Sequence, residues 1–273
     1  MRKVDVGASI EWIGAAFAAV RAHPAAFLVM GLIFTVIPLV PLLGGIVILL
    51  LGPALLAGMI YAAREADQGR TPKVGHLFQA FQDGDRIGSL IALCLPVFAA
   101  LLLMIVVAMP IIIAIANSGQ IDAQTLSDQA ALAAALHPIL SAMAGRLLLT
   151  LVLIVVIAFV AGMLTFLAAA CIMLGRDPAF VAMRKSFAAC ARNFGAYLIT
   201  VLLLGLGLGL LRIVLSQLLP EILAAVLTST PYYALLGPLT YAAYRSIFGD
   251  DTSAPVNEAA PPPPPSSSHT LEA

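Results

Sequence analysis

Long segments without Asp, Glu, Lys or Arg alternate with short charged segments along this chain. The charge-free segments span 22–63, 87–121, 147–175, 193–211, 213–220 and 222–244. A helix that crosses a bilayer needs about 20 apolar residues, so the first segment has room for two, with PLVPLLGG at 38–45 as the turn between them. The pattern therefore predicts six transmembrane helices joined as three hairpins. These spans lie near 25–43, 45–63, 88–116, 147–173, 194–212 and 224–244.

Composition assigns these apolar segments to a membrane rather than to a soluble core. Hydrophobic residues make up 62% of the chain, charged residues only 10%, and the mean hydropathy is +1.04. Soluble domains carry about 25% charged residues, so this chain has too few charges to cover a surface that faces water. The sequence therefore predicts an all-α integral membrane protein whose six-span domain covers residues 1–248.

Lysine and arginine are distributed unequally between the two sides of this arrangement. If the N-terminus lies inside, twelve basic residues fall on the cytoplasmic side and only Arg146 and Arg212 on the outer side. The cytoplasmic loops of membrane proteins carry the excess of Lys and Arg. Both termini are therefore predicted to be cytoplasmic.

One stretch of the sequence occurs twice. FAAVRAHPAAFL at 17–28 and FAACARNFGAYL at 187–198 share five of twelve residues after a shift of 170 positions. Each stretch precedes an apolar hairpin, and both hairpins end with Tyr-Ala-Ala, at 61–63 and at 241–243. Both units enter the membrane from the same side, so the sequence predicts a parallel pseudo-repeat of the first and last units.

Each repeated unit begins with a predicted amphipathic helix on the cytoplasmic surface. In the last unit, Asp177 and Pro178 are suited to start a helix over 178–193, and four of its apolar residues share one face. These are Phe180, Met183, Phe187 and Cys190, matched by Ile10, Ile13, Phe17 and Val20 in the first unit. A weaker third instance is TPKVGHLFQAF at 71–81. The alternative is that amphipathic helices arose separately beside unrelated hairpins.

Two sets of charged residues are candidate sites. Arg184, Lys185 and Arg192 lie away from the apolar face of the helix over 178–193, where they can meet the headgroups of anionic lipids. On the outer side, Arg212 can pair with Glu221 across the connection of the last hairpin. A structural ion pair or a solvated helix end is the favoured interpretation of Arg212, and a substrate site is the alternative.

The sequence contains no recognisable catalytic, cofactor or metal site. None of the six span centres contains Asp, Glu, Lys, Arg or His. Proton-coupled carriers and intramembrane metalloproteases need ionisable groups at that depth, so both classes are disfavoured. The three cysteines, Cys94, Cys171 and Cys190, have no CxxC spacing and are interpreted as apolar packing residues.

Small residues recur at helical spacing in three of the spans. They are Ala54, Gly58 and Ala62; Ala158, Gly162 and Ala170; and Gly205 with Gly209. Such faces allow two helices to approach closely. They predict packing within the bundle or, alternatively, between two copies of the chain.

The C-terminal segment 249–273 differs in composition from the rest of the chain. It is rich in Asp, Ser and Ala and contains PPPPPSSS at 261–268. This composition is typical of a disordered segment with a stiff polyproline insert. We expect a solvated cytoplasmic tail, with a docking motif for a partner as the alternative.

Two segments carry a resemblance to known membrane proteins. They are DPAFVAMRKSFAACARNFGAYL at 177–198 and PKVGHLFQAFQDGDRIGSL at 72–90. Over residues 5–248 the chain resembles an uncharacterised family of proteobacterial six-helix inner-membrane proteins. It is distantly similar to YciC-type proteins and to the membrane domains attached to some glycerophosphodiester phosphodiesterases. The resemblance implies a bacterial inner membrane and transfers no catalytic residue.

The sequence therefore favours a non-enzymatic membrane protein, with a structural, interaction or lipid-organising role. A transporter or channel-like protein for a small or lipidic solute is the alternative, and a polar, water-accessible cavity would favour it. The expected partners are membrane lipids; a protein partner or a homo-oligomer stays open, and no nucleic acid is expected.

Overall fold

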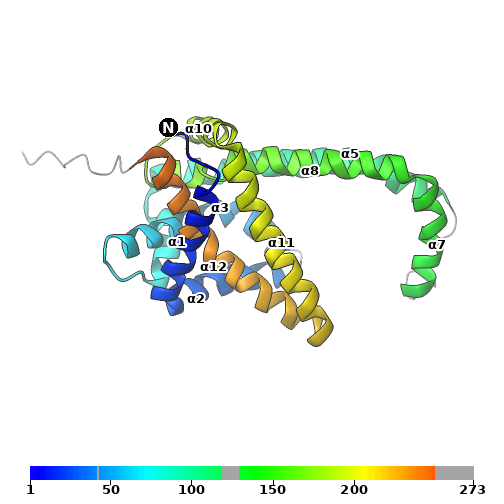
Figure 1. Cartoon of the computed structure of the whole chain (residues 1–273), viewed down its shortest axis with the longest axis horizontal. Helices are drawn as coiled ribbons and strands as arrows, with labels where there is room; N and C mark the ends of the chain where they lie inside the picture. Colours follow the sequence, from blue (N-terminus) through cyan, green and yellow to red (C-terminus); the bar gives the residue numbers. More distant parts are fainter. Residues whose placement is uncertain (42, 119–128, 250–273) are drawn as a thin grey trace, which may run out of the picture.

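A computed structural model of the chain describes residues 1–41, 43–118 and 129–249, and every regular element in these ranges is a helix (Figure 1). The first half contains α1 (Ala8–Ala22), α2 (Pro24–Val36), η1 (Ile37–Leu39), α3 (Leu43–Asp67), η2 (Val74–Gln82), α4 (Gly84–Ile91) and α5 (Cys94–Asn117). The second half contains α7 (Gln129–Ala142), α8 (Ala144–Thr165), α9 (Ala168–Met173), α10 (Ala179–Arg192), α11 (Phe194–Leu218) and α12 (Glu221–Phe248). The predicted tail lies outside these ranges, apart from Gly249.

Several of these helices are long and apolar enough to cross a membrane. Among the described residues, five helical segments meet that test alone, and a sixth does so only if α1 and α2 are counted as one bent unit. The fold is therefore that of an all-α polytopic membrane protein, as predicted. The hairpins α5–α8 and α11–α12 extend away from the end of the molecule that holds the N-terminus and α10 (Figure 1).

The first span is shorter than the sequence pattern predicts. Where a helix near 25–43 is expected, α2 ends at Val36 and continues as η1 only to Leu39. Between α1 and α2 the chain bends by 107°. This bend follows from Pro24, because proline is tolerated in the first turn of a helix but cannot continue the hydrogen-bond ladder of the helix before it.

Two other spans that the sequence predicts as continuous contain breaks. The span near 88–116 divides at 92–93 into α4 and α5, and the span near 147–173 divides at 166–167 into α8 and α9. In the first case Pro96 lies in the opening turn of α5, a position that suits proline. In the second case a side chain of α10 satisfies the backbone at the break, as described below.

The packed part of the molecule is centred on α12, which contacts α1, α2, α3 and α11. Phe34 of α2 stacks on Tyr233 of α12 with ring centroids 5.3 Å apart. The Thr230 and Thr35 hydroxyls lie within hydrogen-bond distance at 3.3 Å. These contacts join the first and last hairpins, which are far apart in the sequence.

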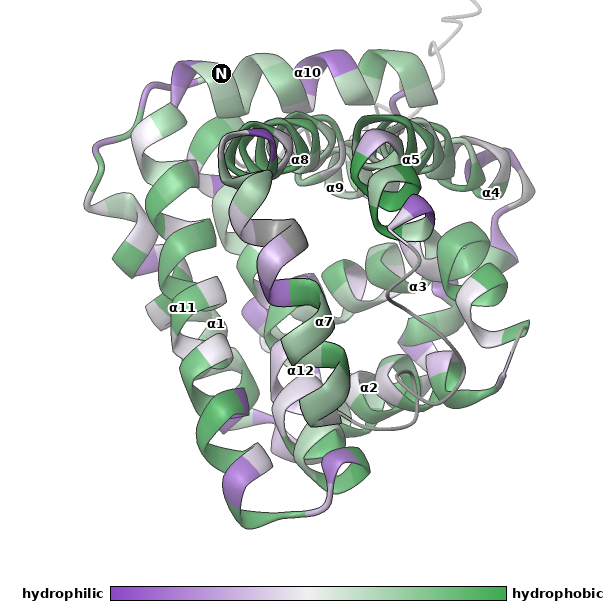
Figure 2. Cartoon of the chain, turned by 90° about the vertical axis from the view of Figure 1, so that its right-hand side faces the viewer, coloured by the Kyte–Doolittle hydropathy of each residue, from purple (hydrophilic) through white to green (hydrophobic). Residues whose placement is uncertain are grey.

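The α5–α8 hairpin is exposed over most of its length. Leu102, Val106, Ile113, Leu149 and Val156 are between 49% and 65% exposed. Both helices point toward the viewer in Figure 2 and are coloured hydrophobic along most of their length. Lipid is the solvent that such a surface requires.

The pseudo-repeat is visible in the burial of α1 and α10. Ile10 and Phe17 are 67% and 52% exposed, and the residues 170 positions later, Phe180 and Phe187, are 71% and 40% exposed. The buried faces also correspond, since Ala16 and Ser186 are both fully buried.

The predicted apolar face of the helix over 178–193 is divided between two environments. Met183 and Cys190 are buried against the bundle, whereas Phe180 and Phe187 face outward. The prediction of one membrane-facing stripe is therefore wrong for half of its members. Ala179, Ala182 and Ala189 complete the buried face, because small side chains let α10 lie close to α8 and α9 in a way that phenylalanine rings would prevent.

Candidate functional site

The position of α10 is fixed by Ser186. Its hydroxyl donates to the carbonyl oxygen of Met163 at 2.7 Å and accepts the N–H of Leu167 at 3.0 Å. Both backbone groups lie at the break between α8 and α9, where the helix no longer satisfies them. Ser186 therefore supplies the hydrogen bonds that the missing helical turn would make. It holds α10 against the α8–α9 break.

Ser186→Ala should destabilise the protein substantially. The substitution leaves a buried carbonyl and a buried N–H without partners, and each costs about 1–3 kcal/mol. We expect a fall of several degrees in the thermal unfolding midpoint of the purified protein in detergent.

Ser216→Ala is the matched control, because the Ser216 hydroxyl donates only to the carbonyl of Ile213 within its own helix turn. Equal melting temperatures for the two variants would contradict the bridging role of Ser186.

The three basic residues proposed as a lipid site do not have equivalent positions. The Lys185 ammonium donates to both carboxylate oxygens of Asp177 at 2.7 and 2.8 Å, so it ties α10 to the segment before it. Arg184 and Arg192 are exposed, and neither forms an ion pair with a described residue. Arg184 lies one helical turn after Phe180, and side chains at this spacing are neighbours. The candidate headgroup contacts are therefore Arg184 and Arg192, beside an outward phenylalanine.

The other two helices that the sequence predicts to lie at the interface, α1 and η2, repeat this combination of an exposed aromatic ring and a cation. In α1, Phe17 precedes Arg21 by one turn, and both are exposed. In η2, the rings of Phe78 and Phe81 lie 6.2 Å apart, and Lys73 at the start of the helix is exposed. Exposed apolar rings next to cations are typical of helices that lie in a bilayer interface.

Arg212 and Glu221 are brought together at the opposite end of the α11–α12 hairpin. Their guanidinium and carboxylate form an ion pair, and Arg212 also reaches the backbone carbonyl of Glu221 at 3.4 Å. A pair as exposed as this one contributes about 0–1 kcal/mol. Its geometry links α11 to α12 across the turn.

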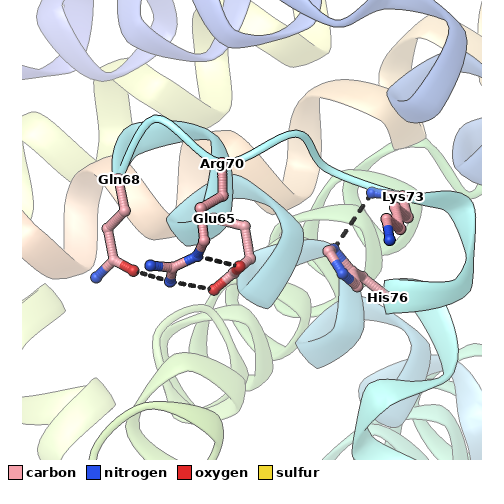
Figure 3. Close-up of polar contacts among 5 residues, drawn as sticks. All are labelled: Glu65, Gln68, Arg70, Lys73 and His76. Carbon is pink, nitrogen blue, oxygen red and sulfur yellow. Dashed lines mark hydrogen bonds and ion pairs between the residues drawn. The ribbon is translucent and has the colours of Figure 1, made fainter.

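A network of polar side chains closes the turn between α3 and η2 (Figure 3). Glu65, only 7% exposed, accepts hydrogen bonds from Arg70 at 2.5 and 2.6 Å, and Arg70 also contacts Gln68. Hydrogen bonding to the Glu65 carboxylate raises the pKa of the Arg70 guanidinium. The turn itself needs Gly69, whose φ is +74°. We assign this network to the local fold.

Groups suited to metal binding or nucleophilic chemistry are scarce in the part of the chain that the structure describes. Among residues 1–41, 43–118 and 129–249, no three His, Cys, Asp or Glu side chains are grouped so that they could hold a metal ion. Cys190 is 1% exposed, and burial raises the pKa of its thiol to about 12. That thiol is therefore protonated and unreactive at neutral pH.

A cavity of about 890 Å³ opens between α1 and the C-terminal ends of α3 and α12. Its polar wall includes Asp67, which accepts a hydrogen bond from Tyr241 at 3.0 Å and pairs with Arg245 at 2.6 Å. Trp12 lies in its wall, and so does the acidic Glu11. The cavity combines charges of both signs with aromatic rings at the end of two spans.

Sequence reasoning did not find this cavity. The residues that line it lie at four places in the chain, at Arg2 and near 11–23, 63–67 and 238–249, and only the packing of α1, α3 and α12 brings them together. A signal was nevertheless present, because the repeated Tyr-Ala-Ala at 241–243 supplies Tyr241 to the wall, and the chain has a single tryptophan. The chain matches no protein-family model, no curated protein and no solved structure.

Proposed function

We propose that this protein is a non-enzymatic component of a bacterial inner membrane that organises anionic lipid at the cytoplasmic leaflet. The observation that carries the proposal is the repeated construction of α1, η2 and α10. Each presents at least one exposed aromatic ring and a cation outward, and α1 and α10 also bury a face of mostly small residues on the bundle.

The two contributions to lipid binding are comparable in size. Each Lys or Arg close to an anionic leaflet contributes about 1 kcal/mol. A phenylalanine side chain contributes about 1.5–3 kcal/mol when fully transferred from water. Phe180 and Phe187 are already partly covered by protein, so their share is smaller. Binding by α10 would therefore need both its rings and its arginines.

The cytoplasmic orientation is supported by where the basic residues lie in space. The Arg2 N–H donates to the carbonyl of Ile247 at 2.7 Å, so the two described ends of the chain meet. Asn193, at the end of α10, accepts the N–H of Val4 at 2.8 Å. The segments that carry most of the Lys and Arg residues therefore meet at this end of the molecule. In membrane proteins the side with the excess of Lys and Arg faces the cytoplasm.

A transporter is the second candidate, because the cavity has polar and charged walls. From α3 the cavity is lined by Ala63 and later residues, and from α12 by Pro238 and later residues. Both sets lie toward the C-terminal ends of their spans. Transporter sites lie near the bilayer midplane. The position of the cavity therefore favours binding at the interface over transfer across the membrane.

The proposal is tested by the lipid that accompanies the protein. We expect the double variant Arg184→Gln/Arg192→Gln to retain at least severalfold less anionic lipid per protein, because two contributions of about 1 kcal/mol are lost. The measurement is mass spectrometry of lipids after extraction from a bacterial membrane into copolymer nanodiscs.

Arg184→Lys/Arg192→Lys is the matched control, since it keeps both charges and should retain anionic lipid as the unmodified protein does. If the glutamine variant kept the same amount of anionic lipid, the basic residues would act only as a topology signal, and the proposal would fail.

A further inference from the structure

Two charges in the wall of the cavity are not matched by the protein. Asp67 is already occupied by Arg245 and by the Tyr241 hydroxyl. Glu11 and Arg2 also line the cavity, and neither forms an ion pair with any residue that the structure describes. Both side chains are exposed, so one negative and one positive group are open to a ligand.

Trp12 supplies a third unmatched group. It is 2% exposed, and its indole N–H has no hydrogen-bond acceptor among the described residues. Buried N–H groups without a partner are rare in folded proteins and call for a specific explanation. The nitrogen itself is inaccessible to solvent, so a molecule in the cavity would contact the ring of Trp12 and not this donor.

The size and remaining walls of the cavity suit an amphiphilic molecule. Its volume of about 890 Å³ lies within the range of roughly 300–1,000 Å³ found for ligand sites. Ala15, Ala19 and Ala66 form apolar walls beside the charged groups. The outer side of α1 carries the exposed Ile10 and Phe17, which places the cavity beside the interface where lipid headgroups lie.

We propose that the cavity binds the headgroup of a zwitterionic phospholipid of the bilayer, with its phosphate at Arg2 and its ammonium at Glu11. A phosphate supplies the oxygen acceptors that a guanidinium requires. An ammonium matches the carboxylate of Glu11 and is also attracted to aromatic faces. A headgroup with only negative charge would leave Glu11 facing a like charge. The inference goes beyond the proposed lipid-organising function, since it concerns a different surface and a different lipid class.

The single tryptophan makes this site directly observable. Trp12 is the chain's one source of indole fluorescence, so its emission reports on the cavity in the full-length protein in detergent. We expect a saturable change on titration with dihexanoyl phosphatidylethanolamine. Dihexanoyl phosphatidylglycerol should bind about tenfold more weakly, since it lacks the group that would pair with Glu11.

Variants of Glu11 and Arg2 distinguish the contributions of the ammonium and the phosphate to binding. Glu11→Gln should remove the preference for phosphatidylethanolamine, and Arg2→Gln should weaken binding of both lipids about tenfold. Lys3→Gln is the matched control, because Lys3 is next to Arg2, is exposed and does not line the cavity. Its affinities should equal those of the unmodified protein.

Three results would overturn the inference. They are no saturable change in Trp12 emission with any lipid, equal affinity for the two lipids, and binding of glycerophosphoethanolamine as tight as that of the lipid. The last result would mean that the ligand is a soluble phosphoethanolamine compound and not a lipid of the bilayer. The test of Arg184 and Arg192 measures the anionic lipid retained at α10, a different helix. Either proposal can therefore fail while the other stands.

Discussion

Gly58→Ala should strongly destabilise the protein, although alanine is normally the better residue inside a helix. A Cβ atom added at Gly58 would lie 2.1 Å from the carbonyl oxygen of Leu77 and 2.5 Å from that of His76. Both contacts are with the backbone of η2, which cannot move away as a flexible side chain could. Overpacking of this kind costs about 3 kcal/mol, or a fall of roughly 6–12 °C in melting temperature.

Gly205→Ala should have the opposite effect. No atom lies within 4 Å of a Cβ built at Gly205, and replacing glycine by alanine in an exposed helix interior stabilises it by about 0.5–1 kcal/mol. Both variants can be compared by thermal unfolding in the same detergent. If Gly58→Ala were as stable as the unmodified protein, the close approach of α3 to η2 would be refuted.

These two glycines illustrate the limit of motif reasoning. The sequence places Gly58 between Ala54 and Ala62, and Gly205 in GxxxG with Gly209, and it predicts close packing for both faces. In the structure Ala54 and Ala62 are fully buried, whereas a Cβ at Gly205 or Gly209 would meet nothing. A small-residue face permits a close contact, but a second helix must be present to make it.

The long-range architecture was more predictable than the site. Charge-free runs of about 20 residues locate the spans because lipid imposes that length directly. The breaks were not predictable, since the one at 166–167 depends on Ser186 from another helix. The partner of Lys185 was equally hidden, because Asp177 is eight positions away along a turn that no periodicity describes.

The cavity could not be predicted from the sequence, because its wall is also formed by residues that are far apart in the chain. Glu11 and Tyr241 share its wall, although 230 positions separate them in the sequence. Helical periodicity shows which residues of one helix share a face, but not which faces of different helices meet. The repeat gave one partial indication, because the shared Tyr-Ala-Ala marks the ends of α3 and α12 as corresponding positions in the two units.

Reporter fusions should assign opposite sides to the two ends of the hairpins. Fusions after Arg86, Arg192 and Arg245 should report a cytoplasmic location, and one after Asp128 an external location. The physical reason is the ratio of twelve basic residues to two, since short loops rich in Lys and Arg are retained inside. An external signal after Arg192 would overturn the six-span arrangement.

The first hairpin is the strictest test of that arrangement. The 16 residues from Pro24 to Leu39 give a helical length of only about 25 Å, less than the roughly 30 Å of the hydrocarbon core. The 25 residues of α3 are long enough to cross, at about 37 Å. We expect α3, which follows directly, to carry the connection near Pro41 to the outer side, with α2 accommodated by local thinning of the bilayer. A fusion after Pro41 should therefore report an external location, whereas a cytoplasmic signal there would mean that α2 and α3 form a re-entrant loop.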